Sequence, residues 1–189
     1  MTRLFHFSEE NEIGVFMPRP VAVPSPRKAG MDWLNGPLVW CIDDWHQPMY
    51  LFPRDCPRIL VWPTRETTPD DRVAHGPAPE CRMTAYIEWP WLKRLSEAVL
   101  YRYALPSDDF ESLHDAGMWV SRSPATPTEV VTITDIPASL VDAGVELRVV
   151  PSLQALKGLW QTSLHVSGIR LRNAKAPPPS QTLPSPRPS

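Results

Sequence analysis

Short apolar runs separated by turn-forming residues recur along the chain and predict a series of β-strands. The run 99–105 alternates in the way expected of a strand with one buried face. The predicted strands lie at residues 4–7, 38–42, 59–62, 83–88, 99–105, 118–121, 130–133 and 146–150. All of them are short, so we expect a sheet protein with many turns.

Three short helices and one isolated helical turn are predicted between these strands, from apolar residues spaced three and four positions apart. The helices lie at residues 91–98, 136–143 and 152–160, with Gly144 closing the second and Ser152 capping the third, and the turn lies at 108–113. Interleaved short strands and helices are typical of an α+β fold. We therefore expect a compact domain of mixed or antiparallel strands with short helices.

The chain is expected to form one domain over residues 1–173, because 189 residues are enough for one sizeable core but not comfortably for two. The remaining stretch, 174–189, is rich in Pro and Ser and is predicted to be a disordered tail. Residues 21–28 are predicted to be an extended connection. Residues 64–79 contain little that is apolar and are predicted to be a surface loop.

Composition narrows the function classes. The 24 prolines favour short elements joined by rigid turns, because each Pro removes a backbone donor and fixes φ. A net charge of −2 with scattered basic residues argues against nucleic-acid binding. No apolar stretch approaches the roughly 20 residues that span a bilayer. Three cysteines without a C-x-x-C pair, and no signal-peptide pattern, predict a reduced, cytoplasmic setting.

The run 36–63 holds most of the candidate chemistry, because polar and reactive side chains there lie between two predicted strands. Asp43 and Asp44 follow the first strand directly. They are suited to hold a ribose hydroxyl, a metal or a transferable proton, or alternatively Asp44 caps a turn. Tyr50 lies between two prolines on no more than one helical turn. It either stacks on a planar ligand or packs in the core with its hydroxyl satisfied locally.

The segment that follows Tyr50 places two arginines four residues apart around a carboxylate. Arg54 and Arg58 have guanidinium groups that suit phosphates and carboxylates. We expect one of them to pair with Asp55 and the other to be available for an anionic ligand. Cys56 is either a buried structural thiol or a nucleophile whose pKa the arginines lower.

His6 is the histidine that falls within a predicted strand, and by alternation it faces away from its neighbours Phe5 and Phe7. It either contacts a ligand in a cleft or bonds a backbone carbonyl, with Ser8 positioned beside it. His46 is interpreted as a solvated residue. The cysteines and histidines lack the close spacing of a zinc site, so no metal site is predicted.

Several motifs together resemble a bacterial family of uncharacterised proteins over about residues 1–173. The matching segments are Leu-Phe-His-Phe-Ser-Glu at 4–9, Ile13, Phe16, Pro18 and Arg19, Val-Trp-Cys-Ile-Asp at 39–43, Tyr-Leu-Phe-Pro-Arg-Asp-Cys-Pro-Arg at 50–58, and Gly-Met-Trp-Val-Ser-Arg at 117–122. This resemblance implies no activity, because the family it points to has no established function.

The order of these motifs also resembles, more distantly, the ADP-ribosyltransferase-like fold with its split sheet. That resemblance implies that His6 binds a ribose and that Tyr50 stacks on nicotinamide. Where that fold carries a catalytic Glu, this chain has Gly117 and Met118. Asp115 or Glu111 in the preceding turn would have to take its place.

The leading hypothesis is therefore a domain that binds a nucleotide-like ligand such as NAD or ADP-ribose, with weak or absent ADP-ribosyl transfer. The predicted ligand-binding residues are His6, Ser8, Asp43, Tyr50, Arg54 and Arg58. Whether the chain is an enzyme stays open at this point. The alternative is a non-enzymatic domain that binds another protein through a surface rich in Trp and Pro, since the chain has eight tryptophans.

Overall fold

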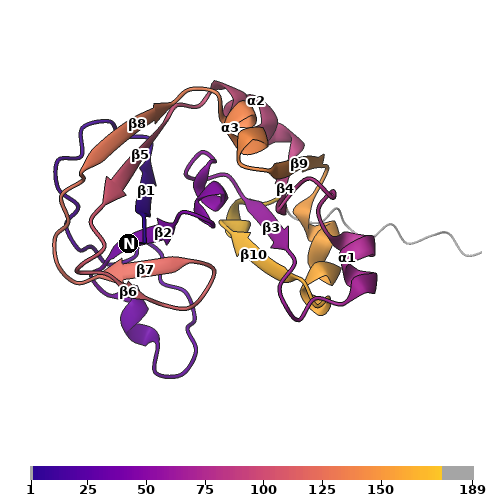
Figure 1. Cartoon of the computed structure of the whole chain (residues 1–189), viewed down its shortest axis with the longest axis horizontal. Coiled ribbons are helices and arrows are strands. Elements are labelled where there is room, and N and C mark those ends of the chain that lie inside the picture. Colours follow the sequence, from indigo (N-terminus) through magenta and orange to yellow (C-terminus); the bar gives the residue numbers. More distant parts are fainter. Residues whose placement is uncertain (1, 176–189) are drawn as a thin grey trace, which may run out of the picture.

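The apolar runs form two β-sheets in the computed structural model, which describes residues 2–175 (Figure 1). The larger sheet contains β1 (Leu4–Ser8), β2 (Val39–Asp43), β5 (Leu100–Leu105), β6 (Glu111–Ser112), β7 (Met118–Ser121) and β8 (Glu129–Ile133), in the order β6-β7-β2-β1-β5-β8. The smaller sheet contains β3 (Arg58–Trp62), β4 (Met83–Glu88), β9 (Val145–Val150) and β10 (His165–Ile169), in the order β10-β3-β4-β9. Neighbouring strands are antiparallel except β4 and β9, which are parallel.

Short helices connect these strands. The α-helices are α1 (Pro69–His75), α2 (Trp89–Glu97) and α3 (Ile136–Asp142), and the 3₁₀-helices are η1 (Asp32–Asn35), η2 (Gln47–Tyr50), η3 (Leu153–Gln161) and η4 (Leu171–Asn173). Helices α2 and α3 lie together at the top of the view in Figure 1, beside one end of the smaller sheet. The architecture is α+β, as the sequence predicts.

The main hydrophobic core lies between the two sheets. Phe5 and Ile42 contribute from the larger sheet and Leu60 from the smaller one, and all three are almost fully buried. Leu95 of α2 and Leu140 of α3 complete this core from above. Burying a side chain of this size stabilises the fold by about 1.5–3 kcal/mol relative to leaving it in water, which is why the strands are so strongly apolar.

The segment that links β2 to β3 runs between the two sheets and carries η2 (Figure 1). Met49, Leu51 and Phe52 of this segment are buried in the main core. Pro48 occupies the first turn of η2, where its fixed φ suits a helical start. The apolar side chains of η2 therefore hold the turn inside the fold, and Tyr50 is carried with them.

The outer face of each sheet has its own smaller core. Phe16 and Phe110 cover the larger sheet over Tyr103. Leu153 and Leu159 of η3 cover the smaller sheet. Both faces of each sheet are therefore packed with apolar side chains, and polar side chains gather at the ends of the strands, which we call the rims of the sheets.

The prediction of a surface loop at 64–79 is wrong in part, because α1 lies within it. Thr68 caps this helix by accepting a hydrogen bond from the backbone N–H of Asp71, and Pro69 takes the first helical position. None of the residues of α1 is buried. The helix therefore lacks the apolar periodicity from which helices are predicted. The Thr68-Pro69 cap at its N-terminus is the sequence signal that indicates a helix here.

The helical turn predicted at 108–113 is also wrong in part. Glu111–Ser112 forms β6, which pairs with β7. The helix predicted at 152–160 exists, but as the 3₁₀-helix η3 with Ser152 as its N-cap. The strand β10 and the helices η1 and η4 were not predicted.

No helix within residues 2–175 is long and apolar enough to cross a membrane. The predicted disordered tail at 174–189 falls almost entirely outside the described residues. The last described residue, Lys175, donates its backbone N–H to both carboxylate oxygens of the buried Glu88, at 3.2 and 3.0 Å.

Candidate functional site

His6 faces away from Phe5 and Phe7, as alternation predicts. Its ring packs against Phe16 with centroids 4.6 Å apart, on the outer side of the larger sheet, whereas Phe5 belongs to the core between the sheets. Its Nδ1 lies 2.8 Å from the carbonyl oxygen of Trp40. Burial lowers the pKa of His6, although the bond to Trp40 works in the opposite direction. Of the two alternatives for His6, the contacts match the bonding of a backbone carbonyl.

Tyr50 is enclosed on the inner side of the larger sheet. Its ring is stacked near Phe7 with centroids 6.5 Å apart, and its hydroxyl donates to Sδ of Met118 at 3.6 Å. Burial raises the pKa of this phenol. His6 and Tyr50 therefore contact different cores on opposite faces of β1, and the structure does not bring them together.

Arg58 is buried, with 2% of its surface exposed. Its Nε donates to the carbonyl oxygen of Met49 at 2.8 Å and its Nη1 donates to that of Cys56 at 2.9 Å. The guanidinium also lies over the rings of Tyr50 and Phe52, 5.5 and 5.1 Å from their centroids. Burial lowers its pKa to about 10, so Arg58 stays charged at neutral pH. These contacts tie η2 to the start of β3.

Ser8 and Arg54 differ in their exposure. Ser8 is buried and accepts a hydrogen bond from the N–H of Glu10 at 3.0 Å. Arg54 is exposed, and its backbone N–H donates to Glu9 at 3.3 Å. The expected ion pair of Asp55 with one of the arginines is absent from the described residues.

Cys56 is a buried thiol whose pKa burial raises to about 12, although Arg58 and Arg94 work to lower it. A thiol must ionise to react quickly. We therefore expect Cys56 to be alkylated by iodoacetamide at pH 7.5 only after denaturant is added, with the modified residue identified by peptide mass spectrometry. The partly exposed Cys81 provides the internal control, because it should react first in the folded protein.

Asp43 forms a polar pair with His46 at the end of β2. Its Oδ1 accepts from the backbone N–H of His46 at 2.8 Å, and the same oxygen lies 2.8 Å from Nδ1 of the imidazole. Burial works to raise the pKa of Asp43, but the bonds from His46 outweigh it and the pKa falls below its usual value. The carboxylate is therefore ionised at neutral pH and can only accept, so Nδ1 carries the proton. The turn expected to be capped by Asp44 is capped by Asp43 instead.

Two indoles and a second histidine surround this pair. Trp45 and Trp62 each contact His46, with centroids 4.6 and 5.5 Å away. His165 stacks on Trp62 with centroids 4.1 Å apart and planes within 18°. Both imidazoles therefore contact one indole. Burial lowers the pKa of His165, while Asp115 works to raise it and His46 to lower it. We call Asp43, Trp45, His46, Trp62 and His165 the rim cluster.

Arg82 extends the rim cluster. Its guanidinium lies 5.4 Å from the ring centroid of Trp45. Its Nε is buried and has no hydrogen-bond partner within residues 2–175. Burial lowers the pKa of Arg82, and the carboxylates of Asp44 and Asp43 work to raise it. Because protein atoms cover this nitrogen, the terminal nitrogens of the guanidinium are the ones that a bound molecule could reach.

Sheet pairing explains why residues so far apart in the chain meet here. Asp43 ends β2, and Trp62 ends β3. In antiparallel pairs the end of one strand lies beside the start of its neighbour. His165 at the start of β10 is therefore paired with Trp62, and Arg82 just precedes β4. The segment after β2 then brings His46 against the rim of the smaller sheet.

The loop between β6 and β7 lies against the Asp43–His46 pair. Gly117 has φ +70°, and its carbonyl oxygen accepts from the N–H of Asp43 at 2.9 Å. A Cβ added at Gly117 would overlap the His46 ring and would lie 2.8 Å from Cγ of Asp43. His114 and Ala116 in the same loop also have positive φ, 52° and 45°. Such conformations cost about 1–3 kcal/mol each and tend to cluster at functional sites.

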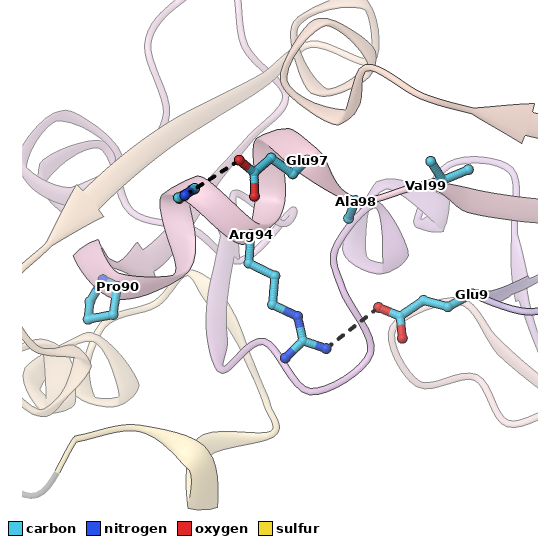
Figure 2. A pocket seen from close by; sticks show the side chains of 7 residues that line it. Glu9, Pro90, Arg94, Glu97, Ala98 and Val99 are labelled. Atoms are coloured by element: carbon cyan, nitrogen blue, oxygen red, sulfur yellow. Dashed lines mark ion pairs between the residues drawn. The ribbon is translucent and has the colours of Figure 1, made fainter.

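A hollow lies on a different part of the surface. About 620 Å³ opens between α2 and Glu9, and Figure 2 shows Arg94 pointing from the helix toward Glu9 across it. Ion pairs at this hollow are exposed and long, 4.0 Å for Arg94 with Glu9 and 3.8 Å for Lys93 with Glu97. Exposed ion pairs of this kind contribute little to stability and do not hold their side chains in one position. The hollow holds no histidine or cysteine and no unpartnered buried donor.

Sequence reasoning found Asp43 but missed the rest of the rim cluster. His46 was interpreted as solvated, although its position three residues after Asp43 fits a turn in which a carboxylate holds the imidazole. His165 lies in an unpredicted strand. No group of three potential metal ligands lies close enough to hold a metal ion in the part of the chain described. The rim cluster therefore offers imidazoles, a carboxylate and indoles for binding and proton transfer.

A protein-family model described as "Family of unknown function (DUF6886)" matches residues 5–174, almost the whole of the described chain. This confirms the resemblance to an uncharacterised family. No curated protein and no solved structure matches the chain. The more distant resemblance to the ADP-ribosyltransferase-like fold therefore stays a prediction, as does the surface rich in Trp and Pro.

Proposed function

The chain belongs to this family of unknown function, and we propose that it binds a small nucleotide-like ligand at the rim cluster. The observation that carries the proposal is the Asp43–His46 pair, set between indoles at a partly exposed edge of the fold. The proposal keeps the ligand class expected from the sequence. It moves the site to the rim from His6 and Tyr50, whose rings pack in the cores and whose Nδ1 and hydroxyl, respectively, already form hydrogen bonds within the protein.

The planar part of the ligand fits Trp45. This indole is 40% exposed although it packs edge-on against His46 and Trp62. An exposed indole held by such contacts loses little freedom when a flat ring stacks on it. Stacking of a nucleic-acid base on an aromatic side chain is worth about 1–3 kcal/mol, or roughly 5- to 150-fold in affinity.

The polar groups of the rim cluster fit the rest of a nucleotide. The ionised carboxylate of Asp43 can accept a hydrogen bond from a ribose hydroxyl through its second oxygen. The guanidinium of Arg82 lies beside the ring of Trp45, and its terminal nitrogens can donate to a phosphate oxygen. Because Asp44 and Asp115 are also near, a ligand with hydroxyl groups beside its phosphate suits the cluster better than inorganic phosphate.

Calorimetric titration of the protein with NAD, ADP-ribose and AMP tests the proposal. We expect dissociation constants in the micromolar to millimolar range for at least one of them. Trp45→Ala should weaken that binding by about tenfold, because it removes one stacking surface. The absence of heat for wild type with all three at millimolar concentration would contradict the proposal.

Trp160→Ala is the matched control for Trp45→Ala. Trp160 is 46% exposed, close to the value for Trp45, but it belongs to η3 on the outer side of the smaller sheet. Binding should be unchanged in this variant. Equal weakening in both variants would show that loss of any exposed indole perturbs the fold, and the ligand would then not lie on Trp45.

A further inference from the structure

His46 and His165 lie against one indole, and each keeps a ring nitrogen that forms no hydrogen bond within the part of the chain described. They contact the same indole, Trp62, with centroids 5.5 and 4.1 Å away. Within residues 2–175, no protein group forms a hydrogen bond with Nε2 of His46 or with either ring nitrogen of His165. Two imidazoles with unengaged nitrogens are therefore available on one small area of surface.

The surroundings give the two imidazoles different roles. Asp43 holds Nδ1 of His46 and fixes the orientation of the ring, so Nε2 is the nitrogen left to donate a proton to a bound molecule. His165 stacks on Trp62 and has no carboxylate hydrogen-bonded to it. Burial lowers its pKa, so His165 is mainly neutral at pH 7 and can accept a proton.

Two of the three thiols, Cys41 and Cys56, cannot supply the nucleophile. Burial raises the pKa of Cys41 far above neutral pH and that of Cys56 to about 12. Neither is in the rim cluster. An acid and a base without a protein nucleophile suit a reaction in which water loses one proton while an oxygen leaving group gains another.

From this geometry we infer that His46 and His165 form an acid–base pair that hydrolyses a phosphodiester of a ribonucleotide-like substrate held at the rim cluster. The inference rests on the proposed function, because it needs the nucleotide-like ligand to bind there. The terminal nitrogens of the Arg82 guanidinium, beside Trp45, supply donors for the phosphate.

The step balances with water as the co-reactant, written for a ribonucleoside 2′,3′-cyclic phosphate. His165 takes a proton from water as the water oxygen bonds to phosphorus. One ring P–O bond breaks, its electron pair stays on the ribose oxygen, and that oxygen takes the proton from Nε2 of His46. The product is a ribonucleoside monophosphate. His165 then carries the proton that His46 lost, and exchange with solvent restores both.

The pH dependence follows from the groups that face the two imidazoles. Asp43 and the indoles face His46, while Asp115 from the β6–β7 loop and His46 itself face His165. Arg82 and Asp44 border the cluster. Because His165 must be neutral and its pKa is lowered from 6.5, the acidic limb of kcat/KM should have its midpoint below pH 6.5.

Hydrolysis of 2′,3′-cyclic AMP by the full chain tests the inference, with products separated by chromatography from pH 4.5 to 9. His46→Gln and His165→Gln should each lower kcat at least 100-fold while KM changes less than threefold. His165→Gln should also remove the acidic limb. His75→Gln is the control, because this residue ends the exposed helix α1, and its kinetics should match wild type.

Calorimetry with the same cyclic nucleotide separates failure of this inference from failure of the proposed function. If wild type binds the nucleotide but releases no monophosphate, the acid–base inference is overturned and the binding proposal stands. If wild type neither binds nor cleaves it and also fails to bind AMP, both are overturned. Hydrolysis that persists equally in both glutamine variants would overturn the inference, provided that thermal unfolding shows them folded.

Discussion

Replacing Arg58 with alanine should lower the free energy of unfolding by about 4 kcal/mol. The guanidinium is buried, donates to the carbonyl oxygens of Met49 and Cys56, and lies over two aromatic rings. Its removal leaves a cavity between the sheets and two buried acceptors without a donor. Urea denaturation followed by circular dichroism measures the effect.

Two further variants separate the causes of this loss. Arg58→Met keeps most of the volume, so it removes the hydrogen bonds without the cavity and should cost about 2 kcal/mol. Arg54→Ala changes an exposed arginine four residues away and should change stability by less than about 0.5 kcal/mol. If Arg58→Met were as stable as wild type, the hydrogen bonds from Arg58 to the two carbonyl oxygens would not be the contacts that hold η2 against β3.

Replacing Gly117 with alanine should destabilise the protein by about 3 kcal/mol and abolish binding at the rim cluster. About 1 kcal/mol is the cost of a side chain at φ +70°. The remainder reflects the overlap of the new Cβ with the His46 ring, which must move and break its bond to Asp43. Denaturation and calorimetry on the same variant measure both effects.

Gly30→Ala is the matched control for Gly117→Ala. Gly30 has φ +80°, but a Cβ there would have nothing within 4 Å. It should therefore show the conformational cost alone and leave binding unchanged. Adding His46→Ala to Gly117→Ala should recover the stability lost to the overlap. If Gly117→Ala behaved like Gly30→Ala in both measurements, the Asp43–His46 pair would not depend on the missing side chain.

Gly117 also bears on the expected catalytic Glu. The sequence left open whether Asp115 or Glu111 replaces it. The space beside Gly117 is filled by the imidazole of His46 and the carboxylate of Asp43, so a larger side chain at this position has no room. The nearest carboxylate to Gly117 comes from the end of β2, and the turn before β7 contributes Asp115 only as a longer-range charge on His165.

The fold was largely predictable because its strands are local apolar runs. The predicted runs at 83–88 and 118–121 coincide with β4 and β7, since both lie across a core that needs continuous apolar side chains. Helix α1 escaped prediction because it buries nothing. β10 escaped because each of its residues is only partly buried or exposed, so its sequence carries a weak apolar signal.

The candidate site was less predictable, because it depends on strand pairing and not on spacing along the chain. Asp43 could be identified from its place after an apolar strand. His165 could not, because its neighbour Trp62 lies about a hundred positions earlier in the sequence and meets it only through the β3–β10 register. Tyr50 and Arg58 show that polar residues in a motif are ambiguous, because the same residue types that suit a ligand also form contacts inside the core.

The dispersal of the rim cluster along the chain has a consequence for folding. Its members come from β2, β3 and β10 and from the segment after β2, so the cluster exists only when both sheets have formed and docked. Contacts of such long sequence separation form late and slowly. A ligand that binds the cluster thus selects the complete native state and no partly folded intermediate. Ligand binding would therefore raise the free energy of unfolding of the whole chain. In a cell with little ligand, a larger fraction of the protein would be unfolded.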